Sequence, residues 1–146
     1  MAFRDDPQWN RNRRVAQNGT YNSNPLSAVA GIAMLSQLAD GKPHEAANAR
    51  GAELRAVLND VFRRAGVPCV AYGDVSTFHI SLEGAQGTKP KNPALYDTWR
   101  CALMLHGVDV SAHHGWVSAV HGEREIEETA EAARRAVADL QAEGAF

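Results

Sequence analysis

The residues with the clearest chemical potential form a short polar loop that leads into an apolar segment. The loop contains Gly19 and Thr20 and continues through Asn24 and Pro25. Asn24 suits a helix N-cap because its side-chain oxygen can accept from a backbone N–H, and Pro25 suits the first helical position. A helix start offers N–H groups and partial positive charge to an anion, and the Thr20 hydroxyl can donate to the same anion. The pattern predicts a phosphate-binding corner.

The residues alone leave a second interpretation of Thr20 open. A threonine next to a helix start can hydrogen-bond locally and assist the Asn24 cap without any ligand. Both roles use the same residue types, so this segment by itself does not decide between them.

The six histidines form no recognisable metal motif. His113 and His114 are adjacent, and neighbouring side chains on an extended chain point to opposite sides. His79, His106 and His121 lack ligand spacing and cysteine or carboxylate companions. We therefore predict structural or surface roles for the histidines and no metal site.

Two other classes of chemistry lack their supporting motifs. Asp74, Ser76 and His79 are close in sequence, but no Gly-x-Ser-x-Gly elbow accompanies them, which disfavours a hydrolase. The chain also has no phosphate-binding Gly-rich loop and no dinucleotide fingerprint.

Composition limits the class of protein. A chain of 146 residues suits one domain, and a net charge of −2 gives no general attraction to nucleic acid or to an acidic membrane. No run approaches the roughly 18 apolar residues of a membrane span, and the N-terminus has no visible signal peptide. Cys69 and Cys101 have no metal-type spacing and do not require a bond. We predict a cytoplasmic protein.

Four helices are predicted from caps and apolar periodicity, over residues 25–39, 44–65, 92–106 and 123–143. The first is apolar nearly all round, which is typical of a helix buried in a larger fold. In this chain one side of it should be bare unless a partner covers it. The second carries one continuous apolar stripe at the helical period: Leu54, Val57, Leu58, Val61, Phe62 and Ala65.

Four short strands are predicted over residues 69–72, 76–82, 108–111 and 116–120, with a loop over residues 112–115 between the last two. The order is two helices, two strands, a helix, two strands and a helix. This order predicts an α+β fold, in which helices pack on one face of a small, mostly antiparallel sheet.

Several ordered segments resemble one known family. The Gly19–Thr20 loop, followed by Asn-Pro and an Ala-rich helix, resembles the corresponding loop of class III aminotransferases and glutamate-1-semialdehyde 2,1-aminomutases, which are fold-type I enzymes dependent on pyridoxal 5′-phosphate (PLP). Residues 105–108 and 116–121 resemble the family's late Gly-Val strand and its Phe-Leu-Ser-x-Ala-His strand. The acidic helix from Glu123 resembles the family's last helix. The resemblance implies the C-terminal portion of such an enzyme, with the fold of its C-terminal domain.

The resemblance also implies site residues and partners. The family's threonine crosses the dimer interface to bind the cofactor phosphate of the neighbouring subunit, and this role falls on Thr20, with Gly19 beside it. Residues 1–23 would lead in from the large domain and residues 24–146 would form the small domain. The implied partners are a second copy or a complementing large-domain chain, and the intact enzyme would act on a small amino or keto acid.

The family's reactive groups lie upstream of the Gly-Thr loop. Transamination with PLP needs a lysine that forms a Schiff base and an acid that pairs with the ring nitrogen. The lysines here, Lys42, Lys89 and Lys91, match no family motif. Where semialdehyde mutases often carry a glutamate, this chain has His113 and His114. We therefore expect no transamination from this chain alone.

Two hypotheses follow. The chain is a C-terminal fragment that contributes the PLP-phosphate threonine and a dimer surface. Alternatively, it is a non-enzymatic interaction module or an inactive remnant of the family. The missing lysine and the unusually apolar first helix support the second hypothesis.

Overall fold

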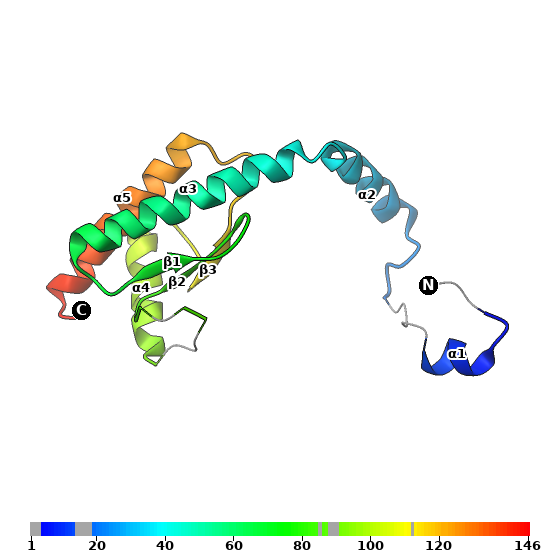
Figure 1. The fold of residues 1–146 in the computed structure, drawn as a ribbon, viewed down its shortest axis with the longest axis horizontal. Helices are drawn as coiled ribbons and strands as arrows, with labels where there is room; N and C mark the ends of the chain where they lie inside the picture. The colour runs from blue at the N-terminus through cyan, green and yellow to red at the C-terminus, as the bar shows by residue number, and fades with distance from the viewer. Residues whose placement is uncertain (1–3, 14–18, 85, 88–90, 112) are drawn as a thin grey trace. The chain divides into compact units, whose positions relative to one another are not determined.

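A computed structural model describes residues 4–13, 19–84, 86–87, 91–111 and 113–146. The chain divides into two compact units, Met1–Asp40 and Gly41–Phe146 (Figure 1). This division falls after Asp40. The sequence-based boundary after residue 23 follows the family's domains and stays a prediction.

The N-terminal unit contains two helices, α1 (Pro7–Asn12) and α2 (Pro25–Leu38), and neither has a buried residue. Helix α2 begins where the sequence predicts and ends one residue earlier. Helix α1 is an addition to the prediction. It is too short to show an apolar period, and the Asp6 carboxylate caps it by accepting from the N–H groups of Gln8 and Trp9.

The C-terminal unit contains the three longer amphipathic helices that the sequence predicts: α3 (Lys42–Ala65), α4 (Pro93–Leu105) and α5 (Glu123–Ala142). Helices α3 and α4 both pack against α5. Helix α3 begins two residues earlier than expected. The left-handed Gly41 precedes it, with φ of 76°, and the left-handed Gly66 ends it, with φ of 68°.

The core belongs to this second unit. Its largest fully buried side chains come from all three helices and from the end of the sheet: Leu58, Phe62, Leu82, Trp99, Leu103, Val137 and Leu140. The Phe62 and Trp99 rings meet edge to face, with centres 5.9 Å apart. The stripe predicted for α3 is thus a core stripe, although Val57 and Ala65 are only half-buried at its margin.

The sheet has three antiparallel strands in the order β1 (Val70–Tyr72), β2 (Thr77–Ser81) and β3 (His114–Trp116). Helix α3 packs on β1 and β2 (Figure 1). The α+β architecture is confirmed. The first two strands fall within their predicted ranges.

The prediction for the last two strands is wrong. One strand, His114–Trp116, replaces the strands expected over residues 108–111 and 116–120, and Ser111 makes only an isolated bridge to His114. The sequence predicted a loop over residues 112–115, but Gly115 lies in β3, directly opposite Phe78 and against its ring. A Cβ there would come 2.6 Å from the Phe78 Cζ. Glycine is therefore needed for close packing of β3 on β2.

Asn92 also differs from its predicted role. It precedes α4, yet its side chain makes no capping hydrogen bond. The Glu83 carboxylate instead accepts from the backbone N–H groups of Lys91 (2.8 Å) and Asn92 (3.2 Å). The Glu83 carboxylate, which precedes these residues by 8 and 9 positions, thus stabilises the backbone just before α4. Within the described part of the chain, no helix is both long and apolar enough to cross a membrane.

Candidate functional site

The predicted Gly-Thr loop forms a tight turn before α2. The Asn22 N–H donates to the Gly19 carbonyl at 3.1 Å, and the Asn24 N–H donates to the Tyr21 carbonyl at 3.1 Å. A Cβ on Gly19 would lie 2.8 Å from the Asn22 Oδ1, so glycine suits this turn. Thr20 is exposed, and its hydroxyl has no hydrogen-bond partner among the described residues. The turn therefore presents a free donor to solvent.

The start of α2 offers less to an anion than the sequence suggested. The Asn24 Oδ1 accepts from the N–H groups of Leu26 (2.9 Å) and Ser27 (3.4 Å), and Pro25 has no N–H. The cap thereby occupies the donors of the first helical turn. The anion donors that remain in this segment belong to the preceding turn, with the Thr20 hydroxyl foremost.

A second candidate site lies in the C-terminal unit, where β3, the segment over residues 108–111 and the start of α5 enclose a cavity of about 300 Å³. Leu54, Phe78 and Ile126 supply apolar wall. The polar lining includes Asp109 and Glu125, which sequence reasoning did not select. Among the residues that the structure describes, no lysine lines this cavity.

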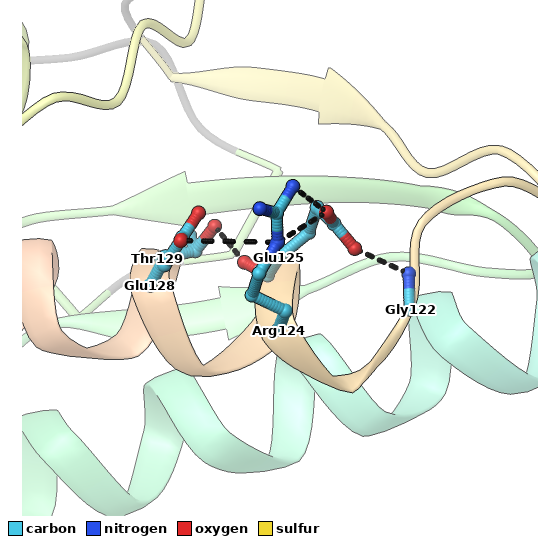
Figure 2. A network of polar contacts seen from close by, with 5 residues as sticks. All are labelled: Gly122, Arg124, Glu125, Glu128 and Thr129. Carbon is cyan, nitrogen blue, oxygen red and sulfur yellow. Dashed lines mark hydrogen bonds and ion pairs between the residues drawn. The ribbon is translucent and has the colours of Figure 1, made fainter.

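Glu125 is the most heavily engaged polar residue of this cavity (Figure 2). Its carboxylate accepts from Arg124 (Nη2 at 2.8 Å) and from the Gly122 N–H (2.7 Å). These hydrogen bonds, that of Arg124 first, lower the pKa of the Glu125 carboxyl from its usual value near 4.5 to about 2. The Thr129 hydroxyl donates to the Glu125 carbonyl at 2.7 Å. The Glu125 carboxylate thus stabilises the first turn of α5.

Two other ionisable side chains of the cavity, Asp109 and His121, also have structural partners. Arg100 donates to both carboxylate oxygens of Asp109, at 2.9 and 3.2 Å, and this pair lowers the pKa of the Asp109 carboxyl. The His121 Nδ1 accepts from the Ser118 N–H at 2.8 Å, which assigns the proton of a neutral ring to Nε2. Glu125, Asp109 and His121 are therefore held in place by structural contacts.

Of the cavity residues Asp109, Glu125 and His121, only Glu125 has a local sequence pattern that predicts its role. A glutamate three positions after Gly122, opening a helix, is the acidic half of a capping box. The pairing of Asp109 with Arg100 depends on how the chain leaves α4, and no local pattern indicates it. Among the described residues, no three or more His, Cys, Asp or Glu side chains are arranged to hold a metal ion.

Comparison with known proteins identifies the class. The chain is 30% identical over 137 residues to glutamate-1-semialdehyde 2,1-aminomutase of Pyrobaculum aerophilum, and the alignment covers 88% of this chain and 32% of that relative. Its structure is similar to an omega-transaminase from Sphaerobacter thermophilus (28% identity, TM-score 0.76, 87% of this chain and 31% of the other). It is also similar to a transaminase with PLP bound (27% identity, TM-score 0.77, 90% and 31%). No family model matches the chain.

The relatives and the structural neighbours are thus members of the same family that the sequence resembles. The chain belongs to the family of PLP-dependent class III aminotransferases and glutamate-1-semialdehyde aminomutases. It spans about a third of the length of the curated relatives that it matches, which is consistent with the C-terminal portion of the family fold.

The residues present fit the phosphate end of PLP and not its reactive end. An exposed turn with an unpartnered hydroxyl is suited to a phosphate oxygen. A Schiff base requires a lysine beside the cofactor. Lys42 opens α3, Lys91 lies in the loop before α4, and Lys89 lies outside the described residues.

Proposed function

We propose that this chain provides the small C-terminal lobe of a class III PLP enzyme, and that Gly19 and Thr20 contact the PLP phosphate in an assembly that supplies the large domain. The observation that carries this proposal is the Thr20 hydroxyl, which is exposed in a tight turn without a partner among the described residues. Similarity to the family supports it, because the chain aligns with about a third of the length of its relatives and contains the Gly19–Thr20 loop.

In this proposal the chain binds and positions the cofactor but does not react with it. PLP, when bound, supplies an electron sink for reactions at the carbon that bears the amino group. Thr20 donates its hydroxyl proton to a phosphate oxygen and fixes that end of the cofactor. The intact assembly acts on a small amino or keto acid. This chain alone performs no transamination.

Helix α2 supplies the surface for that assembly. Its large apolar side chains are exposed on several sides, including Leu26 (79%), Ile32 (66%) and Leu35 (68%). A helix without a polar face is stable in water only when another surface covers it. The covering surface in this proposal is the large domain, from a complementing chain or within a homodimer of longer chains. The two free cysteines, Cys69 and Cys101, suit a reducing cytoplasm.

The test mixes this chain with the N-terminal part of a related aminomutase. This partner retains the large domain and ends just before its own Gly-Thr loop. We expect a stable complex that binds PLP, detected by sizing with light scattering and by the ³¹P signal of the cofactor. Thr20→Ala should weaken PLP binding by about 1.5–3 kcal/mol, as expected for a lost hydrogen bond to a charged group. Thr20→Ser, which keeps the hydroxyl, should bind nearly as the original chain does.

A complex that forms but binds PLP equally well with Thr20→Ala would contradict the phosphate role. Failure to form any complex would favour the second candidate function, a non-enzymatic interaction module or inactive remnant. The exposed apolar surface of α2 supports that candidate. A chain that stays monomeric and ignores both PLP and the truncated relative would argue for an independent, repurposed domain.

A further inference from the structure

The face of the sheet opposite the core carries a row of rings, with one from each strand. Tyr72 on β1 lies directly opposite His79 on β2, and His79 lies directly opposite His114 on β3. The Tyr72 and His79 rings stack, with centres 5.3 Å apart and planes 26° apart. The His79 and His114 ring centres are 5.9 Å apart. The row thus places two imidazoles next to each other on a half-buried surface.

The backbone register brings these two imidazoles as close as a sheet allows. The Ile80 N–H donates to the His113 carbonyl at 2.7 Å, and the Val117 N–H donates to the Ser76 carbonyl at 2.9 Å. Because bonded and non-bonded pairs alternate in an antiparallel ladder, His79 and His114 form a non-hydrogen-bonded pair. Side chains of such pairs approach most closely, with Cβ atoms about 4.5–5.5 Å apart.

The ring geometry suits a shared ligand. Two imidazoles that bind one tetrahedral metal ion at about 2.0–2.1 Å through nitrogen hold their ring centres about 5 Å apart. The observed separation of 5.9 Å exceeds that value by less than about 1 Å. Neither ring has a hydrogen-bond partner among the described residues, so their nitrogens are available. Tyr72 stacks on one ring, and the Trp116 ring meets the other edge to face at 5.0 Å, which restricts both rings.

We propose that His79 and His114 bind one divalent transition-metal ion on the open face of the sheet, with water as the remaining ligands. Imidazole nitrogen favours copper, nickel and zinc over calcium and magnesium. With only two protein ligands, the site binds more weakly than a closed structural zinc site. The two histidines are far apart in sequence, so spacing along the chain could not reveal this pair.

The test titrates the untagged chain with Cu²⁺, Ni²⁺, Zn²⁺ and Mg²⁺ by calorimetry, in a buffer that does not bind metals. We expect one ion per chain, with affinity in the order Cu²⁺ above Ni²⁺ and no binding of Mg²⁺. His79→Gln and His114→Gln should each weaken binding at least about tenfold, because removal of even an outer partner of a metal ligand costs that much. Far-UV circular dichroism should show that both variants remain folded.

Two further histidine variants locate the site. His44→Gln, at an exposed position on α3, should leave the affinity unchanged. His113→Gln removes an imidazole whose ring centre also lies close to that of His114, at 5.1 Å, but adjacent side chains on an extended chain point to opposite sides, so this variant should leave the affinity within about twofold of the original. Binding that survives both His79→Gln and His114→Gln, or that depends on His113 and not on His79, would overturn the proposal. Absence of any binding of Cu²⁺ or Ni²⁺ would overturn it equally.

Discussion

The Glu125 carboxylate at the start of α5 makes the stability of this helix depend on pH. Arg124 and the Gly122 N–H hold the pKa of Glu125 near 2, well below its usual value near 4.5. The folded state therefore binds fewer protons than the unfolded state between these pH values. The stabilisation is complete above about pH 4.5 and is lost as the pH falls toward 2.

Glu125→Gln should lower the free energy of unfolding at pH 7, and its difference from the original chain should shrink as the pH falls from 4.5 toward 2. Urea unfolding at several pH values measures this difference. The effect should be modest and should weaken with salt, because the Arg124 side chain is 78% exposed and solvent screens the pair. The control is Glu127→Gln on the same helix, which removes a carboxylate without an ion pair in the described structure. A difference that is constant across this pH range would contradict the assignment.

At the scale of elements, the outer edge of β1 is closed by one side chain from α3. The Asn59 amide donates to the Ala71 carbonyl and accepts from the Ala71 N–H, both at 2.8 Å. An edge strand with unpaired backbone groups can pair with another chain, and a covering side chain prevents this. Asn59 thus joins α3 to the sheet and protects the edge.

Asn59→Leu should destabilise the C-terminal unit by about 2 kcal/mol or more, because it leaves the N–H and carbonyl of the buried Ala71 without partners. Urea unfolding measures the loss, and amide exchange at Ala71 should become faster. The matched control is Asn92→Ala, whose side chain makes no capping bond and which should change stability by less than about 0.5 kcal/mol. Equal effects of the two substitutions would show that the edge contact does not stabilise the fold.

At the scale of the whole molecule, stability and association belong to different units. All the buried apolar side chains of the described residues lie between Leu54 and Leu140, within the C-terminal unit. The N-terminal unit buries none and exposes the apolar residues of α2. Folding and partner binding are therefore separable in this chain.

Deletion of residues 1–40 should leave a chain that unfolds cooperatively, with a stability within about 0.5 kcal/mol of the full chain, because the two helices that it removes contain no buried residue. The same deletion should reduce self-association in sedimentation velocity, because it removes the exposed apolar helix. Thermal unfolding by circular dichroism is the companion measurement. A truncated chain that does not unfold cooperatively would show that the core needs the N-terminal unit.

The elements that the sequence predicts well are those with many local signals. Helices α2, α3 and α5 each have a period or a cap that is visible within one segment, and their observed ends fall within two residues of the predicted ones. The strand around Gly115 was misplaced because its position depends on Phe78, which lies on another strand. The donor set at Thr20 was partly misjudged because the Asn24 cap occupies the helix N–H groups.

The amino-acid sequence by itself indicated the family, the α+β class and the positions of the longer helices, because these depend on residue type and local spacing. Tertiary structure alone decided which distant groups meet: His79 with His114, Asn59 with the edge of β1, and Arg100 with Asp109. Such pairs form when strand register and helix packing bring separate segments together, and no periodicity within one segment records them.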